Sequence, residues 1–215
     1  VYNEMKGVFS DPLSVLDRQS NKALFPDNSY HFESGGDPDA IPSLTQEEFV
    51  DFYKRHYHPT NSQSFVSGTA DDIIEALDLI DSYMNMYKYN AAAKTGSEIK
   101  YQKKNFKEPL PASIPYAVRK IEENQGQDMF AITWLLNDSY LTLKALLGLY
   151  VLDYLLIGTN SAPLQKSLAE SDLGTSVIGD GFSTGLLQST FTIGLQGVKN
   201  GDVLTLEKKI MDTLM

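Results

Sequence analysis

A lysine-rich stretch divides this chain into two parts and so limits the folds that it can adopt. Five lysines lie between residues 94 and 107 against the single acidic residue Glu98, and large apolar residues are few from 88 to 111. One-sided charge with low apolar content is typical of a linker or surface segment. We therefore expect two structural units, residues 1–87 and residues 113–215, joined by a linker at 88–112.

The part before the linker carries clear start signals for helices. Asp11 followed by Pro12 predicts a helix over 12–24, with Asp11 as its N-cap. Thr45 with Glu48 predicts a capping box, and Thr69 predicts the start of an amphipathic helix. Residues 64–68 are expected to form a short strand. Residues 25–44 are rich in turn formers and predict an ordered, functional loop.

The part after the linker mixes strand patterns with helix patterns. Strands are expected at 114–122 and 127–136 around the turn Asn124-Gln125-Gly126, and again at 175–178 and 187–198. Helices are expected at 139–157, from Ser161 onward and from Asp202 onward. The combination predicts an α+β protein with antiparallel or mixed sheets.

The run from Tyr140 to Ile157 is the most apolar part of the chain, yet Lys144 and Asp153 interrupt it. We therefore expect a buried core helix there and no membrane association.

Composition narrows the possible functions. The chain has 42% hydrophobic and 21% charged residues, which is typical of globular proteins. Its net charge of −10 argues against binding to nucleic acid and suits a basic partner or substrate. The absence of cysteine excludes disulfides, thiolate metal sites and a cysteine nucleophile.

Two candidate catalytic patterns fail on their context. Gly181-Phe182-Ser183-Thr184-Gly185 matches the G-x-S-x-G nucleophile elbow, but a strand pattern follows it and all three histidines precede it. We interpret it as a glycine-rich turn between strands. His31, His56 and His58 are too few and too poorly spaced for a zinc site of their own, and we interpret them as residues at helix ends.

The first eight residues, Val1-Tyr2-Asn3-Glu4-Met5-Lys6-Gly7-Val8, predict a helix that carries the carboxylate Glu4. Taken by itself, Glu4 fits an ordinary solvated acid on a helix surface. Both ends of the chain have helical patterns without caps, so we expect a piece of a larger protein.

Four motifs in this order carry a family resemblance: the opening octet, Ala23-Leu24-Phe25-Pro26-Asp27-Asn28-Ser29-Tyr30, Ser34-Gly35-Gly36-Asp37-Pro38, and Tyr57-His58-Pro59-Thr60-Asn61. Residues 162–171 and 190–198 extend it beyond the linker. Together they resemble the presequence protease and falcilysin branch of the pitrilysin-type zinc metallopeptidases, the peptidase M16 family.

The resemblance implies a specific role for Glu4. In that family two histidines of an H-x-x-E-H helix bind zinc, the glutamate of that motif is the general base, and a downstream N-E-M-K-G stretch supplies the third ligand. Glu4 occupies the position of that third ligand. The family also implies peptide substrates such as organellar targeting peptides, and a mitochondrial or other organellar matrix location.

The chain departs from the family in containing no H-x-x-E-H motif. No catalytic residue is therefore expected in it, and the general base is expected on a segment before Val1, in the remainder of the same polypeptide. The resemblance predicts the C-terminal part of a zinc-bearing domain over 1–87 and the start of a second, homologous domain over 113–215. Such a fragment is expected to be inactive by itself. The alternatives are a non-catalytic scaffold half of a pitrilysin-type protein and an unrelated α+β interaction module.

Overall fold

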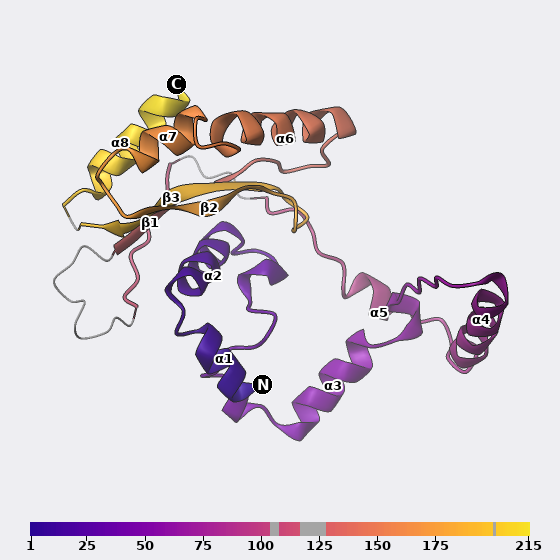
Figure 1. The fold of residues 1–215 in the computed structure, drawn as a ribbon. Coiled ribbons are helices and arrows are strands. Elements are labelled where there is room, and N and C mark those ends of the chain that lie inside the picture. Colours follow the sequence, from indigo (N-terminus) through magenta and orange to yellow (C-terminus); the bar gives the residue numbers. More distant parts are fainter. Residues whose placement is uncertain (104–107, 117–127, 200) are drawn as a thin grey trace. The chain divides into compact units, whose positions relative to one another are not determined.

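The computed structural model describes residues 1–103, 108–116, 128–199 and 201–215 of the chain (Figure 1). These residues form two compact units, one made of 1–36 with 100–215 and the other made of 37–99. The predicted turn at 124–126 and residues 117–122 of the strand predicted at 114–122 lie outside the described residues. The contacts thus group residues 1–36 with the C-terminal part of the chain, while the domain boundaries at 87 and 112 stay predictions.

The larger unit is built around a small antiparallel sheet. Its helices and strands are α1 (Tyr2–Val8), α2 (Pro12–Leu24), η1 (Ser29–His31), β1 (Asp128–Leu135), α6 (Leu143–Ile157), α7 (Pro163–Ala169), β2 (Ser176–Ser183), β3 (Thr190–Val198) and α8 (Val203–Leu214). The strand order is β1-β3-β2, and both pairs are antiparallel. Helices α6, α7 and α8 lie along one face of the sheet, and α2 lies on the other (Figure 1). The predicted α+β class is confirmed.

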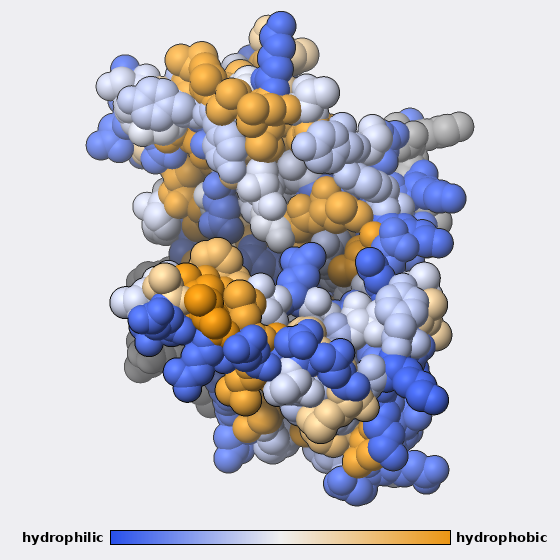
Figure 2. All heavy atoms as spheres, turned by 90° about the vertical axis from the view of Figure 1, so that its right-hand side faces the viewer, coloured by the Kyte–Doolittle hydropathy of each residue, from blue (hydrophilic) through white to orange (hydrophobic). Residues whose placement is uncertain are grey.

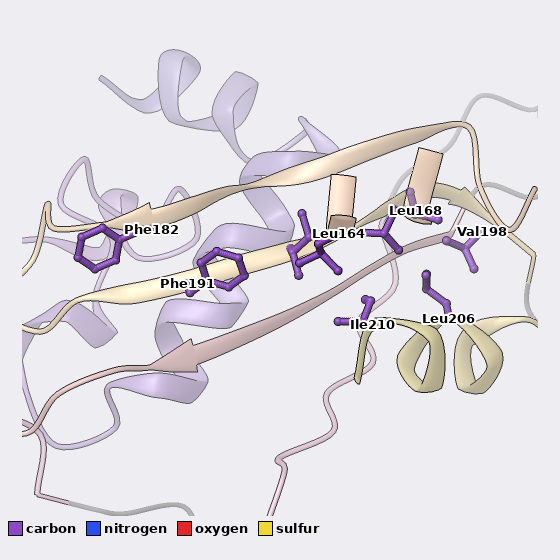
Figure 3. Packing of buried hydrophobic residues seen from close by; sticks show 9 residues of the cluster. Leu164, Leu168, Phe182, Phe191, Val198, Leu206 and Ile210 are labelled. Carbon is purple, nitrogen blue, oxygen red and sulfur yellow. The ribbon is translucent and has the colours of Figure 1, made fainter. Parts of the chain in front are cut away.

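The hydrophobic core lies between the sheet and helices α7 and α8. On β3 the alternating residues Phe191, Ile193 and Leu195 are buried, as the period-two pattern predicts. Figure 3 shows side chains of α7 and α8 facing the sheet across this layer. Leu164 of α7 and Leu206 of α8 are fully buried in the same cluster.

The glycine-rich stretch at the end of β2 has a structural role. The register between β2 and β3 shifts between Ile178 and Gly181, and Gly179 and Gly181 both have positive φ, at 106° and 61°. A Cβ on Gly181 would collide with the Asp153 carboxylate of α6. No helix follows Ser183, because the chain turns directly into β3. The rejection of a nucleophile elbow is confirmed.

Helix α6 differs from the prediction in both its start and its burial. It begins at Leu143, where Thr142 is the N-cap and its hydroxyl accepts a hydrogen bond from the Ala145 amide at 3.3 Å. The expectation of a buried helix is wrong for the described residues: Val151, Tyr154 and Leu155 are each about 60% exposed. Only one stripe of the helix packs on the sheet. A run of apolar residues does not show whether another part of the protein covers the other side of the helix. Within the described parts of the chain, no helix is both long enough and apolar enough to cross a membrane.

The smaller unit, residues 37–99, is made of short helices only. They are η2 (Ile41–Ser43), α3 (Gln46–His56), η3 (Pro59–Asn61), α4 (Ala70–Met84) and α5 (Ala91–Thr95). The predicted capping box at Thr45 is present, and the helix predicted to start at Thr69 does so with a capping box of its own, formed with Asp72. The strand predicted at 64–68 is absent, because a strand needs a hydrogen-bonding neighbour and no strand of this unit supplies one. A helix, α5, lies inside the segment predicted as linker.

Candidate metal centre

Glu4 lies in the first turn of α1, as the sequence predicts, and its side chain is exposed. The helix ends within two turns, where the Ser10 hydroxyl donates a hydrogen bond to the carbonyl oxygen of Gly7 at 2.7 Å. Asp11 then caps α2 by accepting hydrogen bonds from the amide and hydroxyl of Ser14, both at 2.8 Å. These bonds lower the pKa of the Asp11 carboxyl. Glu4 therefore lies on a short helix, and hydrogen bonds between residues close in sequence determine where that helix ends.

Met5, the neighbour of Glu4, fixes α1 against the loop that follows α2. Its side chain is only 6% exposed. It packs on Gly35, where an added Cβ would lie 2.5 Å from the Met5 sulfur. A glycine at this position therefore leaves room for the thioether, and the packing of Met5 determines which side of α1 points to solvent. Sequence patterns contain no signal for this contact.

The segment after α2 is tied to the sheet by aromatic packing and a hydrogen bond. Phe25 is fully buried and meets the Tyr30 ring edge-on, with 5.3 Å between the centroids. The Tyr30 hydroxyl accepts a hydrogen bond from the amide of Leu187, which lies before β3. Residues 157 positions apart in the chain thereby hold the α1–α2 region beside the sheet.

A polar cluster of Asp27, Gln102, Asn137 and Gln188, in which the two glutamines are buried, strengthens this attachment. Gln102 is 1% exposed, and its side-chain amide donates to the Asp27 carboxylate at 2.6 Å while its carbonyl oxygen accepts from the Asp27 amide at 3.1 Å. The backbone amide of Gln102 donates to the side-chain oxygen of Gln188. Gln188 in turn donates to the carbonyl oxygen of Asn137 at 2.7 Å. Four segments that lie far apart in the chain therefore share one hydrogen-bond network.

Acidic groups also come together between α2 and the sheet. Partial desolvation, followed by the negative charges of Asp180 and Asp11, raises the pKa of the Asp17 carboxyl. The Asp17 side chain still reaches solvent, so its effect on stability is softened by water.

Each of the three histidines makes a hydrogen bond through its Nδ1 atom. The Nδ1 atom of His31 lies 3.2 Å from the carbonyl oxygen of Lys22, and Nδ1 of His56 lies 3.0 Å from the Ser97 hydroxyl. His58 caps η3 by accepting from the Thr60 amide at 3.2 Å. His56 ends α3 and His58 precedes η3, which confirms their interpretation as helix-end residues.

Whether this chain can hold a zinc ion depends on how many ligands its side chains supply. Structural and catalytic zinc sites use at least three protein ligands. Across residues 1–103, 108–116, 128–199 and 201–215, no group of three His, Cys, Asp or Glu side chains could hold a metal ion. Glu4 can supply one carboxylate oxygen donor. The described residues therefore fit zinc as the source of a single ligand, and do not form a complete site.

Sequence reasoning missed an apolar cavity in the larger unit. It has a volume of about 170 Å³ and lies between α6, the sheet and the end of α8; its lining residues are Trp134, Leu136, Leu149, Leu152, Asp153, Leu156, Phe182, Phe191 and Leu214. Asp153 is its only acidic lining residue, and this carboxylate accepts a hydrogen bond from the Phe182 amide at 2.8 Å. The cavity can accommodate an apolar group but offers no reactive pair of side chains.

Comparison with known proteins establishes the family. Residues 43–215 match the family model described as the Peptidase M16 inactive domain. The chain therefore belongs to the M16 peptidase family.

Within this family the similarity is to presequence proteases. The chain is 41% identical over 214 residues to presequence protease 1, chloroplastic/mitochondrial, of Arabidopsis thaliana, covering 100% of this chain and 20% of that protein. It is 30% identical over 226 residues to the mitochondrial presequence protease of Mus musculus, covering 100% of this chain and 20% of that protein. It is also 37% identical over 214 residues to Protein HypA of Clostridium perfringens, covering 100% of this chain and 21% of that protein. The predicted resemblance to the presequence protease branch is confirmed, and the chain spans about a fifth of the length of these relatives.

Proposed function

We propose that these residues are part of a zinc-dependent endopeptidase that hydrolyses short unstructured peptides, and that Glu4 supplies one of its zinc ligands. The observation that carries this proposal is the similarity of the whole chain to presequence proteases, which includes the N-E-M-K-G stretch around Glu4. Their names place some of these relatives in chloroplasts or mitochondria, and we extend an organellar location to this protein.

The residues of this chain act by presenting and holding the ligand. Glu4 stands exposed on α1, and the buried Met5 beside it sets the direction of the helix. Tyr30 and Gln102 tie the following segment to the sheet, so the ligand is carried by a well-anchored scaffold. Zinc held by three protein ligands lowers the pKa of bound water and polarises a peptide carbonyl. The general base and the two histidine ligands belong, in this proposal, to the remainder of the polypeptide.

Charge supports the proposed substrate class. Targeting peptides are basic, and a net charge of −10 attracts them over distances comparable with the Debye length, about 8 Å at physiological salt. In this proposal the chain by itself is inactive, because Glu4 offers only one ligand.

The proposal is tested on the full-length protein from the same gene. We expect it to cleave unstructured basic peptides and to leave a folded protein of about the same length as those peptides intact. We also expect a chelator to remove the activity and added zinc to restore it. Activity that survives complete removal of zinc would contradict the proposal.

A second candidate function is a non-catalytic scaffold half. The description of the matching family model as an inactive domain favours it for residues 43–215, a region that does not include Glu4. A full-length protein that binds these peptides without cleaving them, at any zinc concentration, would establish this alternative.

A further inference from the structure

Helix α1, which carries Glu4, is too short to keep a fixed direction by itself. It has seven residues, and helices shorter than about 12–15 residues are marginal in water without packing. Burial contributes little, because Met5 is the only buried residue of α1. Figure 2 likewise shows orange hydrophobic side chains at the surface of the chain, between blue hydrophilic ones. The direction of Glu4 must therefore come from a few side-chain contacts of α1 with its neighbours.

Arg18 of α2 contacts Phe9, the residue that directly follows α1. Its guanidinium carbon lies over the Phe9 ring, 3.2 Å from the ring centroid. The face of an aromatic ring attracts a cation, and the flat guanidinium group also stacks on it. Both residues are partly buried, so water weakens the attraction less than at a fully exposed site. This contact therefore joins the end of α1 to the middle of α2.

The guanidinium group of Arg18 is itself held in place. Its Nε atom donates a hydrogen bond to the carbonyl oxygen of Ser14, one turn earlier on α2, at 3.1 Å. Among the residues that the structure describes, no carboxylate forms a salt bridge with Arg18. A partly buried cation loses some of its hydration, and the face of the Phe9 ring supplies part of the compensation. Arg18 therefore serves the contact with Phe9 rather than an ion pair.

Phe9 is bonded to the turn of α1 that carries Glu4. The Phe9 amide donates a hydrogen bond to the carbonyl oxygen of Met5, the neighbour of Glu4, at 2.8 Å. Met5 in turn packs on Gly35. The contact with Gly35 resists rotation of α1 about its axis, and the contact of Phe9 with Arg18 resists a change in the angle between α1 and α2. Together the two contacts fix where the Glu4 carboxylate lies.

We infer that Arg18 is a positioning residue for the zinc ligand Glu4, and that it acts through the ring of Phe9. The inference rests on the proposed function, because it requires Glu4 to bind zinc. It assigns to Arg18 no contact with the metal or the substrate. Residues that orient a metal ligand typically contribute about 10–100-fold to metal affinity, so the loss of this contact is measurable at equilibrium.

The zinc affinity of the full-length protein tests the inference, measured by competition with a chelator at a temperature where circular dichroism shows every variant folded. Phe9→Leu keeps an apolar side chain but removes the ring, so we expect zinc to bind at least about 10-fold more weakly. Arg18→Gln removes the cation and should have a similar effect. Phe9→Tyr keeps the ring and should bind zinc as tightly as the wild type. Wild-type affinity in both Phe9→Leu and Arg18→Gln would overturn the inference.

Arg55→Gln is the matched control. Arg55 also lies on a helix, but it forms an exposed salt bridge with Asp51, one turn earlier on α3, at 2.9 Å. Such surface pairs contribute little, so this variant should keep wild-type zinc affinity. A loss of affinity as large as that of Arg18→Gln would show that removal of any arginine weakens zinc binding, and it would overturn the inference.

A second measurement does not involve zinc. In the zinc-free full-length protein, the amides of α1 should exchange faster in Phe9→Leu and Arg18→Gln than in the wild type, because without the contact the helix opens more often. Exchange as slow as in the wild type in both variants would overturn the inference.

Combination with Glu4→Gln separates positioning from a general loss of structure. Once the carboxylate is gone, Arg18→Gln should not weaken zinc binding any further, because its effect passes through Glu4. An equal loss with and without the Glu4 carboxylate would overturn the inference but leave Glu4 as a ligand. If Glu4→Gln alone kept wild-type zinc affinity, the proposed function would fail, and the inference would fail with it.

Discussion

Replacing the buried Gln102 tests whether the polar cluster around it holds the region that carries Glu4 to the sheet. Gln102→Ala removes two hydrogen bonds to Asp27, one to its amide at 3.1 Å and one to its carboxylate at 2.6 Å. A neutral hydrogen bond contributes about 0.5–1.5 kcal/mol and one to a charged group about 1.5–3 kcal/mol. Because Asp27 is exposed, water replaces part of this, and we expect a loss of about 1–3 kcal/mol.

Urea denaturation followed by the fluorescence of Trp134 measures this loss. Trp134 is the only tryptophan of the chain and lies in β1, in the same unit as Gln102. Gln63→Ala, an exposed glutamine, is the control and should stay within about 0.5 kcal/mol of the wild type. A Gln102→Ala variant as stable as this control would refute the role assigned to the cluster.

Introducing a negative charge at position 102 tests the same cluster more sharply. Gln102→Glu places a carboxyl against that of Asp27, so one of the two should titrate with a raised pKa in the folded state. A raised folded-state pKa gives stability that is present at low pH and lost as pH rises through it. We therefore expect Gln102→Glu to approach wild-type stability in acid and to fall below it at neutral pH. Combining it with Asp27→Asn restores a donor opposite the carboxylate and should recover stability at neutral pH.

Three further predictions concern the same unit. Leu206→Ala should cost about 2–5 kcal/mol in urea denaturation because Leu206 is fully buried, whereas Leu204→Ala on the same helix, 76% exposed, should cost less than about 0.5 kcal/mol; similar losses would contradict the core assignment. Asp17→Asn should raise the melting temperature at neutral pH and give no gain well below the ordinary carboxyl pKa, since the raised pKa of Asp17 stabilises the folded state only when the group is protonated; a pH-independent gain would contradict this. Gly35→Ala should shift the NMR signal of the Met5 methyl group while costing about 1 kcal/mol or less, because the flexible thioether can move; an unchanged signal would show that the two residues do not touch.

Patterns of neighbouring residues predicted the helices well, but they contain no information on contacts between residues that lie far apart in the chain. Asp11 and the capping-box residues Thr45 and Thr69 act within one turn of the helices that they start, so their effect can be predicted from neighbouring residues. Gln102 lies in a stretch whose lysines predict an exposed linker, yet it is buried through partners 75 and 86 residues away. No local pattern contains that information.

Two of the wrong structural predictions share a physical cause. The apolar run of α6 was expected to be buried and residues 64–68 were expected to form a strand, but burial and strand pairing both depend on a partner surface. Within the described residues neither segment has a complete one. For the candidate site, the sequence predicted that Glu4 lies on a helix, which is confirmed; its role as a zinc ligand stays a prediction. The contact of Met5 with Gly35 could only come from the structure.

The zinc content of the full-length Glu4→Gln variant tests the central claim most directly. A neutral amide in place of the carboxylate removes one ligand, so we expect zinc occupancy after dialysis to fall well below that of the wild type while the circular dichroism spectrum is unchanged. Glu47→Gln is the matched control, because Glu47 is also an exposed acid in the first turn of a helix, and it should retain full zinc occupancy. Full zinc occupancy in Glu4→Gln would contradict the assignment of Glu4 as a ligand.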